Sequence, residues 1–122
     1  MAGIGADVLE TARMAKPMRN RRFCEKVFTG EEMAYCSHKP LETAAGLFAA
    51  KEACVKAAGS GFNGFWPCDV GISHDGQGRP IVNPKGVFKE LCDKRHIRLF
   101  ISISHTKELA IAVAAAETDG EG

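Results

Sequence analysis

The sequence lacks any apolar run close to the roughly 18 residues that a membrane-spanning helix needs. It also lacks a cationic stretch followed by a long apolar one at its start, Met-Ala-Gly-Ile-Gly-Ala-Asp, so we predict no secretory signal peptide. Net charge is nearly absent too, at +1. We therefore expect a cytoplasmic protein without a membrane or nucleic-acid partner, in which any electrostatic partner is recognised by a local cluster.

The five cysteines form no Cys-x-x-Cys pair, and with the four histidines they show no zinc-type spacing. An odd number of cysteines without such pairs is typical of reduced thiols in a cytosolic protein. The chain also matches neither a P-loop nor a dinucleotide-binding glycine fingerprint.

A length of 122 residues fits one domain, 1–122, and the 45% hydrophobic content is ordinary for a globular fold. The patterns predict a strand, three helices, two strands, a helix and two strands. This order favours an α+β fold with helices packed on a mainly antiparallel sheet. Strands are expected at 3–8, 68–73, 79–82, 97–104 and 108–116. Helices are expected at 11–28 (broken near Pro17), from Thr29 to Cys36, from Leu41 to a Gly59 C-cap, and over 87–92. Residues 118–122 are expected to form a flexible tail.

The alanine-rich helix from Leu41 is the element around which the chain is organised. Glu52 and Lys56 are four residues apart and so lie on one face of it. One interpretation is a surface ion pair. The other is an acid and a base aimed at a phosphate-bearing ligand and its metal ion. The helix by itself leaves both open.

The first strand carries a carboxylate on a glycine-lined face. Ile4, Ala6 and Val8 point to one side, and Gly5 and Asp7 to the other. Glycine allows another backbone or a ligand to come close. Asp7 is thus either a ligand-binding group or a cap for the next helix.

Five cations and no acid fall within residues 13–22, namely Arg13, Lys16, Arg19, Arg21 and Arg22. Such a run is either a solvated face or a docking surface for an acidic partner.

The glycine-rich stretch from Gly59 to Pro67 has two interpretations. The first is a helix C-cap and connection, and the second is a loop that packs on a ligand.

Four separated stretches are together typical of one family: Gly-Ile-Gly-Ala-Asp at 3–7, Arg22-Phe23 through Val27-Phe28-Thr29, Phe-Ala-Ala-Lys-Glu-Ala at 48–53, and Ser-Ile-Ser-His-Thr at 102–106. With these motifs the chain resembles the holo-acyl-carrier-protein synthases, which are 4'-phosphopantetheinyl transferases. The resemblance runs from Gly3 to Glu117.

The resemblance implies transfer of phosphopantetheine from coenzyme A to a serine of an apo acyl carrier protein, with release of adenosine 3',5'-bisphosphate. It implies Mg²⁺, with Mn²⁺ as an alternative, and a homotrimer with an active site at each subunit boundary. Whether the carrier serves fatty-acid, polyketide or peptide synthesis is left open.

The same resemblance assigns roles to individual residues. Asp7 and Glu52 match the metal ligands and Lys56 the lysine that approaches the pyrophosphate, and these three are the expected catalytic residues. The base that accepts the serine proton is either Glu52 or a metal-bound water. Further cofactor contacts are expected from His105, Lys51, Gly59 and Ser60, and carrier docking from Arg13, Arg19 and Arg22.

One position departs from the family pattern. Where the family has an arginine before Phe-Ala-Ala-Lys-Glu-Ala, this chain has Leu47, which cannot pair with a phosphate. Leu47 is the only support for a second hypothesis, a catalytically degenerate module that binds coenzyme A or a carrier protein. A third hypothesis is an unrelated metal-dependent nucleotide hydrolase.

Overall fold

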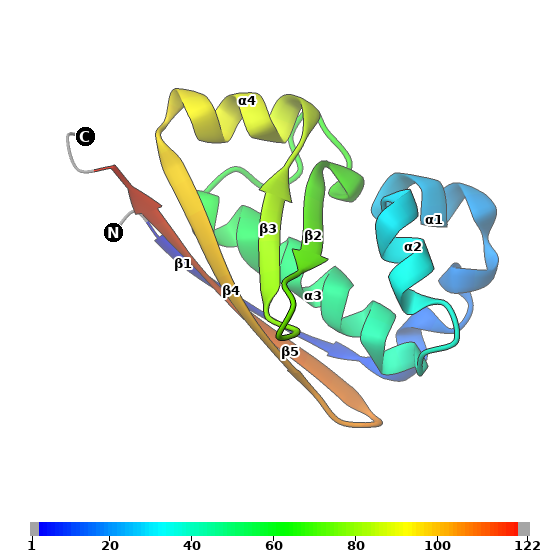
Figure 1. The fold of residues 1–122 in the computed structure, drawn as a ribbon. Coiled ribbons are helices and arrows are strands. Elements are labelled where there is room, and N and C mark those ends of the chain that lie inside the picture. The colour runs from blue at the N-terminus through cyan, green and yellow to red at the C-terminus, as the bar shows by residue number, and fades with distance from the viewer. Residues whose placement is uncertain (1–2, 120–122) are drawn as a thin grey trace.

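The computed structural model describes residues 3–119 (Figure 1). The order of its elements confirms the predicted α+β arrangement. In chain order they are β1 (Gly3–Glu10), the short 3-10 helices η1 (Thr11–Met14) and η2 (Pro17–Arg19), α1 (Arg21–Val27), α2 (Gly30–Cys36), α3 (Leu41–Ala58), the 3-10 helix η3 (Pro67–Asp69), β2 (Val70–His74), β3 (Pro80–Pro84), α4 (Gly86–Lys94), β4 (Ile97–His105) and β5 (Leu109–Thr118).

The strands form two antiparallel groups. β5 lies in the middle of a three-stranded sheet with β1 and β4 on its sides, and β2 pairs with β3 in a separate hairpin. In Figure 1, α3 runs behind the hairpin and along the sheet, while α1 and α2 lie beside the N-terminal half of α3. No helix within residues 3–119 has the length and apolar character needed to cross a bilayer.

The central helix α3 is buried on almost all sides. Twelve of its eighteen residues are buried, most of them alanine, so neighbouring elements approach its axis closely. It ends as predicted, because Gly59 takes a left-handed conformation with φ of 74°, which glycine adopts at little cost.

The backbones of α3 and β1 lie very close together. A Cβ atom added to Gly3 would lie 2.2 Å from the Ala57 carbonyl oxygen, and one added to Gly5 would lie 2.2 Å from that of Ala53. On β5 the face toward α3 is lined by alanines at 110, 112, 114 and 116. These small residues let the sheet and the helix pack backbone to backbone, and Asp7 lies on the same face of β1 as the two glycines.

Two predicted boundaries need correction. The helical stretch at 11–28 is in fact η1, η2 and α1, with Pro17 opening η2, where its missing N–H is not needed. The tail was predicted to begin at Thr118, but Thr118 pairs with Ile97 at the end of β5. Residues 120–122 lie outside the described part of the chain.

We predict that Gly5→Ala lowers the free energy of unfolding by roughly 1–3 kcal/mol or more, because the new methyl group overlaps the α3 backbone. Gly30→Ala is the matched control, since nothing lies within 4 Å of a Cβ there. Urea denaturation of both variants measures the difference. Equal stability of the two variants would contradict the close β1–α3 contact.

Candidate active site

Asp7 and Lys56 meet between β1 and α3. The Lys56 Nζ donates to Asp7 Oδ1 at 3.2 Å and to the Ala6 carbonyl oxygen at 3.0 Å. The Lys56 side chain is 53% exposed and that of Asp7 20% exposed, so the pair lies at the surface with the carboxylate more protected. The lysine thus pairs across to β1, and the Glu52–Lys56 surface ion pair considered from the sequence is not formed within the described residues.

Glu52 completes this cluster. Burial raises the pKa of its carboxyl, the negative charge of Asp7 raises it further, and Lys56 opposes both effects. A carboxyl group whose ionisation is opposed by a neighbouring carboxylate favours the binding of a cation between the two. The cluster therefore joins residues from β1 and α3 that are far apart in the sequence.

The donor set fits Mg²⁺. Within residues 3–119 no group of three or more His, Cys, Asp or Glu side chains is positioned to hold a metal ion. Mg²⁺, however, usually takes only one or two protein carboxylates and completes its shell with water and substrate phosphate oxygens. Asp7 and Glu52 supply that number.

The loop after α3 begins one turn beyond Lys56. The Ser60 backbone N–H donates to the Val55 carbonyl oxygen at 3.1 Å, and its Oγ donates to the Gly61 carbonyl oxygen at 2.9 Å. The first bond closes the C-terminus of α3, as predicted for a helix cap, and the second lies within the loop. A cofactor contact by Gly59 and Ser60 stays a prediction.

Lys51 has another role than the predicted one. Its side chain is fully buried, and Nζ donates to both oxygens of Glu32, at 2.8 and 2.9 Å, and to the carbonyl oxygens of Val70 and Pro67. Glu32 also accepts from the N–H groups of Thr29 and Ile72. With its donors used inside the protein, Lys51 has none left for a ligand, and we remove it from the candidate cofactor contacts.

His105 lies at the end of β4, beside the N-terminal half of α3. Its Cδ2 atom is 3.5 Å from where a Gly46 Cβ would be, and it shares a hollow of about 160 Å³ with Leu47, Tyr35 and His74. Leu47 is 2% exposed, so it lies in the wall of this hollow as part of the core. Sequence patterns gave no reason to single out Tyr35 or His74, which come from separate elements.

The basic cluster, formed by the four arginines and one lysine within residues 13–22, faces solvent. Arg13 lies on η1, Arg19 on η2 and Arg22 on α1, and all three are exposed. Within the described chain none of them forms an ion pair, whereas Arg21 pairs with Glu25 at 3.1 Å. Three of the four arginines in the cluster are thus available to an external partner.

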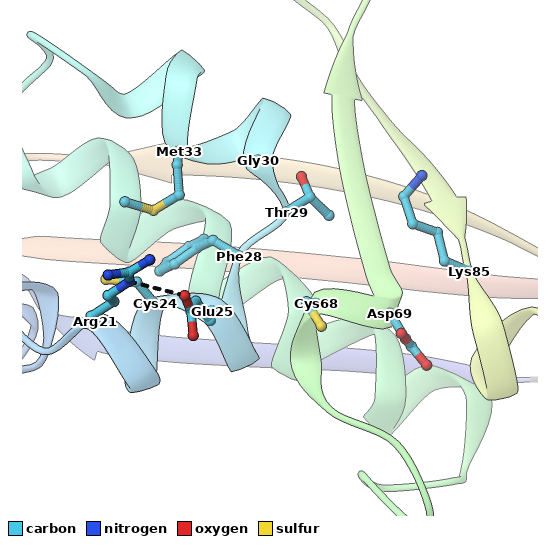
Figure 2. Close-up of a pocket in the computed structure, with 10 residues that line it drawn as sticks. All are labelled: Arg21, Cys24, Glu25, Phe28, Thr29, Gly30, Met33, Cys68, Asp69 and Lys85. Carbon is cyan, nitrogen blue, oxygen red and sulfur yellow. Dashed lines mark hydrogen bonds and ion pairs between the residues drawn. The ribbon is translucent and has the colours of Figure 1, made fainter.

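A larger hollow of about 560 Å³ lies between α1, the start of α2 and η3 (Figure 2). Phe28, Met33, Cys24 and Cys68 give it mostly apolar walls, and the Arg21–Glu25 pair stands at one edge. None of the predicted catalytic or cofactor residues lines it. Size alone therefore does not identify the reaction site in this molecule.

Comparison with known proteins agrees with the geometry. The family model of the 4'-phosphopantetheinyl transferase superfamily matches residues 3–114. The chain is 41% identical to the holo-[acyl-carrier-protein] synthase of Thermoanaerobacter sp. strain X514 over 117 residues, covering 93% of this chain and 85% of the relative. It is also 41% identical to that of Clostridium beijerinckii, covering 94% and 96% of the two chains.

Solved structures of the same kind are similar in fold. The Helicobacter pylori holo-[acyl-carrier-protein] synthase in complex with coenzyme A superposes with a TM-score of 0.83 at 33% identity, covering 93% of this chain and 99% of that one. The Neisseria meningitidis enzyme gives 0.87 at 29% identity, with 97% and 99% covered. The chain belongs to the 4'-phosphopantetheinyl transferase superfamily.

Proposed function

We propose that this protein is a holo-[acyl-carrier-protein] synthase of the cytoplasm, which transfers 4'-phosphopantetheine from coenzyme A to a serine of an apo acyl carrier protein. The observation that carries the proposal is the cluster of Asp7, Glu52 and Lys56 within this fold. Support also comes from relatives that carry this name and from a structural neighbour that holds coenzyme A.

Asp7 and Glu52 are the residues that would hold Mg²⁺, or Mn²⁺ in its place. When bound, the ion neutralises charge on the pyrophosphate of coenzyme A. Burial is the largest cause of the raised pKa of Glu52, and the further rise caused by the charge of Asp7 supports this assignment, because it means that the two carboxylates lie close together.

The transfer itself is displacement at phosphorus. The serine oxygen bonds to the phosphorus that carries pantetheine, the bond to the bridging oxygen breaks, and adenosine 3',5'-bisphosphate leaves. The exposed Lys56 ammonium stabilises the negative charge that develops on the departing oxygen. The serine proton passes to a base, and Glu52 is the side-chain candidate because it lies in this cluster beside Asp7 and Lys56.

We place the nucleotide end of coenzyme A at the hollow of His105. Gly46, beside His105, precedes Glu52 by six residues, or about 9 Å along the axis of α3. Leu47 in the wall brings no charge to this end. The retained catalytic cluster favours an active enzyme over the degenerate binding module that Leu47 alone would suggest.

We predict that incubation of an apo carrier protein with this protein, coenzyme A and Mg²⁺ increases the mass of the carrier by one phosphopantetheine, as measured by intact-mass spectrometry. Asp7→Asn and Glu52→Gln should each lower the rate by at least about 100-fold, because each removes a charged ligand of the cation, and chelation of the metal should do the same. Glu42→Gln, at the far end of α3, is the matched control. Coenzyme A binding without carrier modification would support the degenerate module, and breakdown of coenzyme A alone would support a hydrolase.

We infer that the exposed Arg13, Arg19 and Arg22 receive an acidic surface of the carrier protein. The evidence is their exposure on adjoining segments and their lack of ion pairs within residues 3–119. Opposite charges on two partners accelerate encounter and fix orientation, with a strength that falls as salt rises.

Accordingly, Arg22→Glu should raise the KM for the carrier roughly three- to tenfold at low salt and flatten its salt dependence, with the KM for coenzyme A unchanged. Lys94→Glu on α4 makes the same charge change away from the cluster and serves as the control. A carrier KM equal to the wild-type value at low salt would remove Arg22 from the docking surface.

We further propose that the protein is a homotrimer assembled through the outer face of its three-stranded sheet. This face, opposite α3, exposes large apolar side chains: Ile4, Val8, Phe100, Leu109, Ile111 and Val113, each between 39% and 67% exposed. An apolar sheet face of this extent is typical of an interaction surface, and a second copy of the chain is the occupant that the family resemblance implies.

Sedimentation should therefore give a trimer, and Val113→Asp should shift it to a monomer by placing a charge in the interface. Val87→Asp on α4 is the control, because Val87 is 44% exposed and Val113 45%. A wild-type protein that stays monomeric at micromolar concentration, or a Val113→Asp variant that stays trimeric, would refute this assembly.

A further inference from the structure

Two imidazoles, those of His74 and His105, line the hollow beside His105. His74 ends β2 and His105 ends β4, and the polar hydroxyls of Tyr35 and Thr43 share the same walls. Within residues 3–119, none of its lining residues is a lysine, arginine, aspartate or glutamate. A small hollow of this kind suits an anionic group, and histidine is the side chain that must supply the positive charge.

The ring of His74 is held in place without using its nitrogens. It stacks on Tyr35 with ring centroids 3.9 Å apart and planes 8° from parallel. Within residues 3–119 the imidazole makes no hydrogen bond. The stack fixes the plane of the ring, so both nitrogens remain available to a ligand.

The charged groups around His74 are already engaged. Glu32 on α2 is bound to Lys51, and Asp75 in the β2–β3 turn accepts from the N–H groups of Gln77 and Arg79. The Lys39 ammonium sits 4.7 Å from the centre of the Tyr35 ring. Among residues 3–119, the two carboxylates nearest His74 therefore already have partners of their own when an anion arrives.

These surroundings disfavour the charged form of the His74 imidazole before a ligand arrives. Burial lowers the pKa of its imidazole below the ordinary value of 6.5, and the charge of Lys39 lowers it further, against smaller effects of Glu32 and Asp75. A phosphate beside the ring reverses that balance, because it stabilises the charged form.

We propose that His74 is an anion-recognition residue that contacts the 3'-phosphate of coenzyme A and takes up a proton when that phosphate binds. This rests on the proposed function, in which coenzyme A is the substrate. It assigns to His74 the positive charge that Leu47 does not provide in the same hollow. Selectivity for coenzyme A over its dephosphorylated form then increases as pH falls.

The test compares coenzyme A with dephospho-coenzyme A by titration calorimetry between pH 6 and pH 8. For the wild type, the affinity ratio of the two ligands should rise roughly three- to tenfold from pH 8 to pH 6, the effect of one charge-assisted hydrogen bond. Repeating the titrations in buffers of different ionisation enthalpy gives the number of protons taken up on binding. This number should be larger for coenzyme A than for dephospho-coenzyme A.

The variant His74→Phe keeps an aromatic ring against Tyr35 and removes both nitrogens. It should lose most of the pH-dependent rise and the excess proton uptake, whereas His96→Asn, after α4, should retain both. The titration of the phosphate itself is common to all the proteins and cancels in the comparison.

A wild-type affinity ratio that does not change with pH, or a His74→Phe variant with the wild-type rise, would overturn the proposal. The transfer assay separates this from the proposed function. Turnover with a pH-independent ratio rejects only the role of His74, and proton-linked binding without turnover rejects only the transferase activity.

Discussion

The arrangement of the whole site depends on the backbone contact between β1 and α3. That contact exists because Gly3 and Gly5 have no side chains where the Ala57 and Ala53 carbonyl oxygens lie. Two residues further along the same face of β1, Asp7 reaches Lys56 and comes near Glu52. A larger residue at either glycine would push the strand away and separate the two carboxylates.

The two lysines of α3 show how one helix serves both stability and chemistry. Lys51 faces the interior and joins α3 to α2, η3 and β2 through Glu32 and two carbonyl oxygens. Loss of one partner of such a buried pair typically costs about 3–5 kcal/mol. Lys56 is half exposed and bound to Asp7, so its ammonium remains accessible to a substrate. Fixing the interior side of the helix holds the reactive side in place.

Much of this could be predicted from the sequence because the signals are local. Alanine periodicity and Gly59 predicted α3, and strand alternation placed Gly5 and Asp7 on one face. The helix predicted from Thr29 is also present, and a capping box between Thr29 and Glu32 begins it. Partners distant in sequence could not be predicted: Glu32 also neutralises Lys51, and His74 meets Tyr35 across two elements. The assignments of Asp7, Glu52, Lys56 and His105 came from the family resemblance rather than from spacing.

The central claim is that Asp7 and Glu52 act together as one cation-binding unit. Carboxyl ¹³C NMR titration of Glu52, in the wild type and in Asp7→Asn, tests it most directly. We expect the Glu52 pKa to lie above the ordinary value of 4.5 in the wild type, and to fall both in Asp7→Asn and on addition of Mg²⁺. A Glu52 pKa that is the same in both proteins and does not respond to Mg²⁺ would contradict the account.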